Sequence, residues 1–199
     1  MNIDKSNYFL AERVGTSLLV TFCRPEIRNP LSVAVVEGLR LLMDEAAADR
    51  TVARIVFAGS EGVFASGADL REIAEIDDKG AREFAERGQR LMNAIADARA
   101  VTVAAIDGPC YGGALDLALS CDRRVAAIRS SFAHPGASLG IITGWGGTQR
   151  LPRLVGTPNA LEMFFTASPI TSSRAFAIGL IDQIADDPVA AALEVGDVA

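Results

Sequence analysis

AAIDGPCYGGALDLALSCD, residues 104–122, is the stretch around which the rest of the chain is organised. The apolar run Val101–Ile106 predicts a buried strand, and Gly108 with Pro109 predicts a tight turn after that strand. Gly112 and Gly113 then open a short apolar helix. The stretch therefore predicts a junction at which a strand turns directly into a helix.

This junction has the features of a site that binds an oxygen atom as it becomes negative. The first amides of a helix lack an internal partner and point outward, with the positive end of the helix dipole behind them. Glycine at positions 112 and 113 lets a ligand approach that backbone closely. Asp116, the only acid between Tyr111 and Ser120, is a candidate for proton transfer. The alternative is that the glycines are turn formers and that Asp116 caps the helix.

The length predicts one domain that spans residues 1–199, and the order of strands and helices along the chain makes it an α/β domain. Hydrophobic residues make up 50% of the chain, which predicts apolar surface that a partner subunit would cover. The net charge of -6 provides no overall positive field for nucleic acid or an acidic membrane. We therefore expect no nucleic-acid partner and no membrane association.

Cysteine usage and the N-terminal residues predict a cytoplasmic protein. Residues 1–6 show no apolar core of the kind that a signal peptide needs, and no stretch has the length of a membrane span. Cys23, Cys110 and Cys121 show no CxxC spacing, and His134 is the single histidine. These residues predict reduced, structural cysteines and no metal cluster.

The remaining pattern predicts strands and helices in alternation. Neither GxGxxG nor GxxxxGK[ST] occurs, so the phosphate loops of nucleotide-binding folds are missing. We expect stacked strand-strand-helix turns instead. The predicted elements are a hairpin over 8–13 and 16–22, a helix over 33–48 capped by Ser32, a strand over 54–58, a helix over 71–97 broken near 77–80, a strand over 124–128, a loop over 132–140, helices over 159–166 and 172–178, a strand over 180–184 and a helix after Pro188.

Three segments together carry a resemblance to a known family. They are Phe64–Leu70, Ile106–Asp122 and Phe132–Leu154, in this order and spacing within a match from about Tyr8 to Ile184. The chain resembles the enoyl-CoA hydratase/isomerase (crotonase) family. This resemblance implies the crotonase spiral, also seen in Clp proteases, assembly as a homotrimer or homohexamer, and an acyl-CoA thioester as substrate. Coenzyme A enters as part of that substrate and no other cofactor is implied. Relatives continue beyond the position of Ala199 with further helices.

The resemblance also implies the roles of individual residues. The backbone amides of Ala68 and Gly113 would hold the oxygen of a thioester enolate, with Asp116 as the candidate base. The residues that would border the substrate are Ala65, Ser66, Gly67, Asp69, Leu70, Gly112, His134, Gly136 and Trp145. Arg24 or Arg28 would pair with the phosphates of coenzyme A, or would simply be solvated.

Two positions depart from the hydratases of this family, which use two glutamates. The first position is Asp116, one methylene shorter, and the second is Gly136, which has no carboxylate. Hydration and double-bond isomerisation therefore both stay open. His134 is the remaining titratable group that could face the pocket, or it makes a structural loop contact beside Pro135. We expect Trp145 to shape the acyl pocket.

Two other functional classes stay open at this point. A non-catalytic acyl-CoA binder would explain the glycine at position 136. A Clp-like serine peptidase needs a serine nucleophile paired with a histidine. Ser66, Ser120, Ser138 and His134 exist, but none lies in a matching motif.

Overall fold

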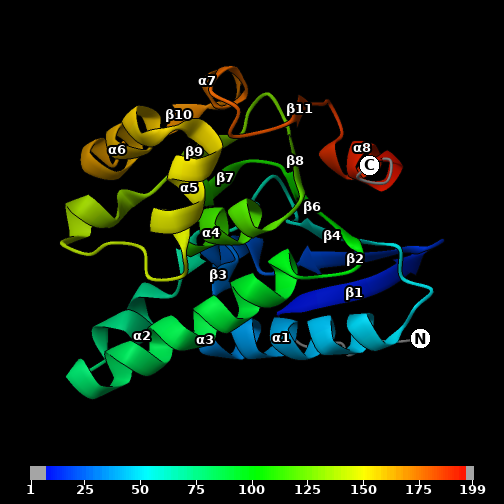
Figure 1. Cartoon of the computed structure of the whole chain (residues 1–199), viewed down its shortest axis with the longest axis horizontal. Helices are drawn as coiled ribbons and strands as arrows, with labels where there is room; N and C mark the ends of the chain where they lie inside the picture. The colour runs from blue at the N-terminus through cyan, green and yellow to red at the C-terminus, as the bar shows by residue number, and fades with distance from the viewer. Residues whose placement is uncertain (1–7, 196–199) are drawn as a thin grey trace.

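The computed structural model describes residues 8–195 (Figure 1). The segment 1–6, for which the sequence predicts no signal peptide, and the last four residues of the expected single domain lie outside that range. A six-stranded sheet forms the frame, with strand order β1-β2-β4-β6-β8-β11. Only β1 runs antiparallel to its neighbour. The strands are β1 (Phe9–Val14), β2 (Ser17–Phe22), β4 (Arg54–Ala58), β6 (Val101–Ile106), β8 (Arg123–Ala126) and β11 (Gln183–Ile184).

Two smaller sheets stand beside the large one. β3 (Pro30–Leu31) pairs with β5 (Gly67–Ala68). β7 (Pro109–Tyr111) pairs with β9 (Ser131–Ala133), which also pairs with β10 (Ile170–Thr171). The chain alternates between the large sheet and the small ones, with β4 before β5, β6 before β7 and β8 before β9. This alternation is the spiral of strand-strand-helix turns that the sequence predicts.

Two of the helices, α1 and α3, begin at polar caps that the sequence provides. Ser32 accepts a hydrogen bond from the amide of Val35 (3.4 Å) at the start of α1, and Asp77 accepts one from Gly80 (2.8 Å) at the start of α3. Asp77 therefore causes the predicted break between α2 and α3. Among residues 8–195, no helix has the length and hydropathy of a membrane span. The helices are α1 (Val33–Ala48), α2 (Leu70–Ala74), α3 (Asp78–Ala96), α4 (Gly113–Ser120), α5 (Gly147–Val155), α6 (Thr157–Thr166), α7 (Ser172–Ala177) and α8 (Pro188–Glu194), with short 3-10 turns η1 (Pro25–Ile27) and η2 (Pro135–Leu139).

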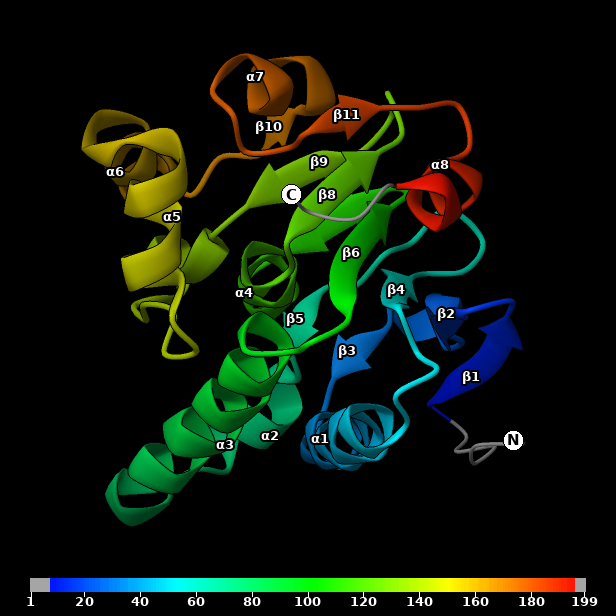
Figure 2. The ribbon, with the colours of Figure 1, turned by 45° about the vertical axis from the view of Figure 1, so that its right-hand side comes forward.

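Helices cover both faces of the large sheet. Alternate residues of β4 belong to different clusters, because neighbouring side chains of a strand point to opposite faces. Ile55 and Phe57 lie in the main core with residues of α1, α3 and α4, whereas Val56 and Ala58 pack in a second cluster with Ala192 of α8. Figure 2 shows α8 on one side of the sheet and α4 and α3 on the other. This double cover explains the nearly continuous apolar run of each central strand.

The structure corrects the predicted elements in the second half of the chain. Residues 132–140 are not a simple loop, since β9 ends at Ala133 and η2 follows. β8 ends at Ala126, and β11 covers only residues 183–184 of the strand predicted over 180–184. The sequence does not predict α5, whose N-cap is Gly146 with φ of 109° and which contains Pro152. The glycines at the start of α5 are typical of a loop, so the sequence pattern does not indicate a helix. The buried side chains of Leu151 and Val155 stabilise the helix by packing.

Candidate active site

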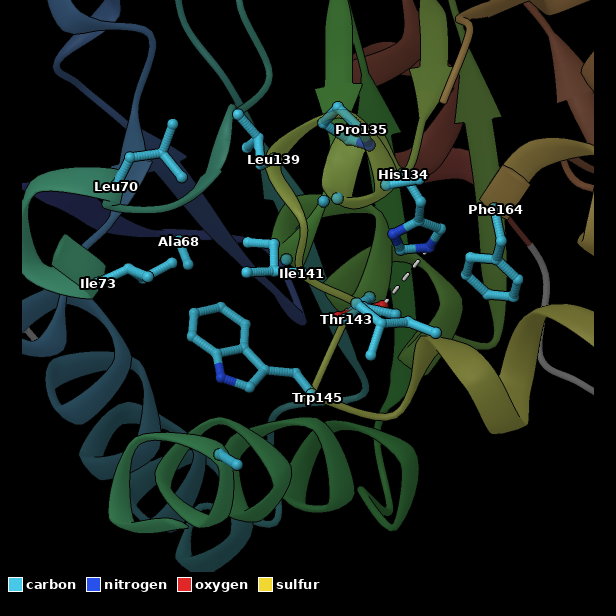
Figure 3. A pocket seen from close by; sticks show the side chains of 18 of the residues that line it. Ala68, Leu70, Ile73, His134, Pro135, Leu139, Ile141, Thr143, Trp145 and Phe164 are labelled. Atoms are coloured by element: carbon cyan, nitrogen blue, oxygen red, sulfur yellow. Dashed lines mark hydrogen bonds and ion pairs between the residues drawn. The ribbon is translucent and has the colours of Figure 1, made fainter. Parts of the chain in front are cut away.

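A cavity of about 580 Å³ opens where the N-terminus of α4 meets α2, α3, η2 and α6. Figure 3 shows the side chains that project into it. Its size is within the range of small-molecule sites, roughly 300–1,000 Å³. The lining is mostly apolar, and Asp116 and His134 are its only titratable side chains among the described residues. The cavity therefore suits an apolar chain with proton transfer at one point.

The two small-residue turns of the sequence meet at one wall of this cavity. Gly67 has φ of 92°, a conformation that favours glycine. A Cβ added to Gly67 would lie 2.7 Å from the Gly113 nitrogen, and a Cβ added to Gly113 would lie 3.2 Å from the Ala68 nitrogen. The main-chain nitrogens of Ala68 and Gly113 are thus close neighbours. Gly113 is the first residue of α4, so its amide has no partner within the helix.

Backbone hydrogen bonds hold both turns in place. The amide of Ser66 donates to the carbonyl of Arg28 (2.9 Å), and the amide of Gly112 donates to the carbonyl of Ala133 (2.9 Å). The amide of Tyr111 donates to the carbonyl of Ala65 (3.3 Å) and joins the turns to each other. These bonds use amides one or two residues before Ala68 and Gly113 and fix the backbone that leads to those two residues.

Asp116 projects from the first turn of α4 and is 1% exposed. Its Oδ2 accepts a hydrogen bond from the hydroxyl of Thr143. Its Oδ1 has no hydrogen-bond partner and lies 3.6 Å from Nε2 of His134, which is also buried and unpartnered. The N-cap of α4 is Gly112, and no side chain caps this helix. Asp116 is therefore not the helix cap that the sequence left open as an alternative.

Burial favours the neutral form of both titratable groups. It raises the pKa of Asp116 to about 7, while the Thr143 hydroxyl, the charge of Arg150 and the nearby amides of Gly147 and Trp145 oppose this rise. Burial also lowers the pKa of His134 to about 4. Near neutral pH the imidazole is uncharged and the carboxyl group is present in both forms.

Gly136 lines the cavity, but its surroundings leave no room for a side chain. The amide of Ile141 donates to the carbonyl of Gly136 (3.0 Å), which folds the following loop back over η2. A Cβ at position 136 would lie 2.5 Å from the carbonyl oxygen of Ile141. The backbone therefore excludes a side chain at the position where the resemblance leads us to expect a second carboxylate.

Trp145 forms the wall between α3 and the start of α4. It is 4% exposed, and its ring lies 5.4 Å from that of Phe84. A Cβ added to Gly113 would lie 2.5 Å from the indole, and one added to Gly88 would lie 2.1 Å from it. Both glycines therefore make room for the ring of Trp145. Figure 3 shows this ring beside the cavity.

We expect Gly88→Ala to displace Trp145 and to lower the free energy of unfolding by about 1–3 kcal/mol, because the new methyl group overlaps the indole. Urea unfolding followed by the fluorescence of this single tryptophan measures both effects. Gly80→Ala in the same helix is the control, since its Cβ would meet only the side chains of Ile76 (3.3 Å) and Asp77 (3.4 Å). Equal behaviour of the two variants would contradict the packing described here.

Some residues expected at the site lie away from the cavity surface. Ala65 and Gly67 are both buried, and neither lines the cavity. Asp69 caps α2 and pairs with Arg71 (2.7 Å). Arg24 faces Glu26 and the ring of Tyr8 rather than the cavity. The other residues of the expected set do line it, namely Ser66, Ala68, Leu70, Gly112, Gly113, Asp116, His134, Gly136 and Trp145.

No serine of the described residues forms a nucleophile with His134. The imidazole lies between Asp116 and the ring of Phe164, whose centroid is 5.1 Å away. The hydroxyl of Ser120 donates to the carbonyl of Asp116 (2.8 Å), and that of Ser138 donates to the carbonyl of Pro135 (2.7 Å). The geometry thus gives no support to a serine peptidase.

Sequence reasoning missed several lining residues. Phe84 belongs to a stripe assigned to the core, yet it lines the cavity while Leu91 and Met92 of the same stripe are fully buried. No sequence motif around Thr143 predicts its hydrogen bond to Asp116. The other lining residues without a sequence signal are Ile73, Ile76, Ala81, Ala85, Pro135, Ala137, Leu139, Ile141, Ile142, Gly144, Leu161, Phe164 and Phe165.

The raised pKa of Asp116 has a consequence for stability. Between about pH 4 and about pH 7 the folded protein retains a proton that the unfolded chain has lost, so its stability falls as pH rises through this range. We expect Asp116→Asn to unfold at a higher urea concentration than the wild type at about pH 8, and at nearly the same concentration at about pH 4. A difference that does not change with pH would contradict the burial of an ionisable group here.

Comparison with known proteins places the chain in a family. Residues 13–194 match the family model described as Enoyl-CoA hydratase/isomerase. The chain belongs to this family. A Bacillus subtilis protein named "Probable enoyl-CoA hydratase" is 39% identical over 160 residues, which are 80% of this chain and 62% of that protein. The short-chain-enoyl-CoA hydratase of Clostridium acetobutylicum is 33% identical over 181 residues, which are 90% of this chain and 69% of that protein.

A solved structure shows the same fold. DspI of Pseudomonas aeruginosa superposes with a TM-score of 0.91 at 35% identity, over 96% of this chain and 79% of that chain. The crotonase fold of the enoyl-CoA hydratase/isomerase family, predicted from the sequence, is therefore confirmed. The chain spans 62% of the length of the Bacillus subtilis relative.

Proposed function

We propose that this enoyl-CoA hydratase/isomerase family member is an acyl-CoA enzyme that stabilises the enolate of a coenzyme A thioester. The observation that supports this most strongly is the proximity of the Ala68 and Gly113 nitrogens at the wall of an apolar cavity that also holds Asp116. Two turns far apart in the sequence, Gly67–Ala68 and Gly112–Gly113, contribute one amide each.

The thioester carbonyl would accept hydrogen bonds from these two amides, and the acyl chain would occupy the apolar part of the cavity. Charge that develops on the carbonyl oxygen would then be held by fixed donors, each typically worth about 10²–10³ in rate. Asp116 would move a proton at the α-carbon. Its pKa of about 7 suits this work, because both the base and the acid are present near neutral pH.

The proposal extends to assembly and location. Phe165 and Phe176 are 78% and 53% exposed, which supports a homotrimer or homohexamer in which such side chains are covered. Cys23, Cys110 and Cys121 are free thiols, which supports a reducing, cytoplasmic location. The substrate would bring coenzyme A, and no further cofactor is part of the proposal.

The proposed function is tested with short-, medium- and long-chain acyl-CoA and enoyl-CoA thioesters in D₂O. We expect hydration, double-bond migration or deuterium uptake at the α-carbon with at least one of them. Binding without any of these reactions would overturn the proposal in favour of a non-catalytic acyl-CoA binder. Gly136, where a carboxylate cannot fit, is the observation that favours that second candidate.

A further inference from the structure

His134 lines the cavity, and the proposed function gives it no role. We propose that His134 is the second proton-transfer group of the site, in place of the carboxylate that Gly136 excludes, and that the pair Asp116–His134 hydrates an enoyl thioester. This inference rests on the proposed function and decides between the two reaction types that the sequence leaves open. Hydration needs one group that takes a proton from water and another that gives a proton to the α-carbon, whereas migration of a double bond needs only one.

The two side chains are built to exchange a proton. Oδ1 of Asp116 and Nε2 of His134 are both buried, both lack a hydrogen-bond partner, and lie 3.6 Å apart. Buried polar atoms without partners are rare and costly, so two that face each other call for a shared role. Hydrogen bonds between catalytic groups are often long in the absence of a substrate and shorten in the complex. The contact therefore suits a proton that passes between carboxyl group and imidazole.

The neighbours of the pair hold its orientation. Thr143 fixes Oδ2 of Asp116, and the ring of Phe164 packs against the imidazole. Gly147 lies so close that a Cβ there would be 2.1 Å from Oδ1 and 3.1 Å from the imidazole, so the pair is enclosed on that side. Figure 3 shows the dashed contact at one ring nitrogen of His134 and the other nitrogen on the side of Ile141, across the cavity. The second nitrogen, Nδ1, is the one that a water in the cavity would meet.

The reaction balances with these two groups and one water. The water oxygen forms a bond to the β-carbon while its proton goes to the lone pair of Nδ1. The carboxylic acid of Asp116 gives its proton to the α-carbon, and the enolate collapses to the thioester of a β-hydroxy acid. His134 is then a cation beside an anionic Asp116, and Nε2 returns a proton to Oδ1. Proton exchange with water in the cavity, which removes the proton from Nδ1 and restores one to Nε2, returns the imidazole to its starting tautomer. The starting state has Asp116 protonated and His134 neutral, which is the state that burial favours.

The charged and titratable groups that face this pair come from two other elements. Arg150 of α5 acts on Asp116 by its charge, and the thiol of Cys110 in β7 interacts with the same carboxylate. Burial raises the pKa of Cys110 well above its usual value. The pH dependence between about 4 and about 7 is therefore that of Asp116 and His134.

The test compares His134→Gln with the wild type in two assays on the same preparation, hydration of an enoyl-CoA and deuterium uptake at the α-carbon of a saturated acyl-CoA. We expect His134→Gln to lose hydration by about 10²-fold or more, while deuterium uptake, which Asp116 alone supports, changes by less than about tenfold.

The pH profile of hydration gives a second readout. In the wild type, the hydration rate should decline below about pH 4 and above about pH 7. The decline below about pH 4 should be missing from the residual activity of His134→Gln.

Ser131→Ala is the matched control, because it removes a hydrogen bond to the hydroxyl of Tyr111 (2.9 Å) from β9, the strand that leads to His134, does not line the cavity and leaves the imidazole itself. It should keep most of the hydration activity. Equal losses of hydration and uptake in His134→Gln, or equal losses of hydration in the two variants, would overturn the role of His134. A wild type that binds acyl-CoA but shows neither reaction would overturn the proposed function itself.

Discussion

Asp116→Asn should lose deuterium uptake at the α-carbon of a bound acyl-CoA by about 10²–10⁴-fold, the usual contribution of a positioned acid or base. The amide has nearly the shape of the carboxyl group, so the bond to Thr143 and the packing against Gly147 can persist. What it cannot do is take up or release a proton. We therefore expect acyl-CoA affinity to stay within a few-fold of the wild type. Uptake is measured by mass spectrometry and affinity by calorimetry.

Asp69→Asn is the control for this change. Asp69 is another buried aspartate, but it caps α2, does not line the cavity, and has asparagine as an equally good replacement at a helix cap. Its variant should keep full uptake. An Asp116→Asn enzyme that exchanges the α-proton as fast as the wild type would remove Asp116 from the chemistry.

Gly67→Ala is expected to reduce the rate of uptake by about 10²–10³-fold, the loss seen when one donor to a developing oxyanion is removed. The new Cβ would lie 2.6 Å from the carbonyl oxygen of Tyr111 and 2.7 Å from the Gly113 nitrogen. Both of these neighbouring atoms belong to the backbone, so the two turns must move apart. Ala68 and Gly113 could then no longer donate to the same oxygen.

Gly15→Ala is the control that distinguishes the loss of the two amide donors from the strain of a left-handed alanine. Gly15, in the turn between β1 and β2, has φ of 60°, and a Cβ there would meet nothing within 4 Å. Gly15→Ala should therefore share the strain of a left-handed alanine, about 1–2 kcal/mol, while the folded protein reacts at the normal rate. If Gly67→Ala also reacts at the normal rate, the two amides do not act together.

The sequence predicts the parts of the fold that depend on local chemistry. The hairpin, α1 with its cap Ser32, and strand β6 follow from turn residues, capping and apolar runs in neighbouring positions. The two glycine turns can also be recognised in the sequence, because the positive φ of Gly67 and Gly112 favours glycine at these positions. The proposal that these turns act together on one oxygen comes from the resemblance to a known family.

The parts that the sequence does not predict depend on contacts between distant segments. Thr143 binds Asp116 from 27 positions along the chain, and nothing near either residue indicates that bond. Gly136 is identified as a missing acid, but its enclosure by Ile141 is visible only in the folded loop. Phe84 has the helical spacing of a core residue. It lines the cavity instead, because the ring of Trp145 fills the space between Phe84 and the start of α4. The spacing of apolar residues along the sequence cannot distinguish residues that line a cavity from residues of the hydrophobic core.

The most direct test of the account is the stretching frequency of the thioester carbonyl of a ¹³C-labelled acyl-CoA, recorded by difference infrared spectroscopy free and bound. Two amides that converge on the oxygen should polarise the bond, so we expect a shift to lower frequency in the wild type and in Asp116→Asn, and its loss in Gly67→Ala. A bound wild-type carbonyl with the same frequency as the free thioester would contradict the convergence of Ala68 and Gly113 on that oxygen.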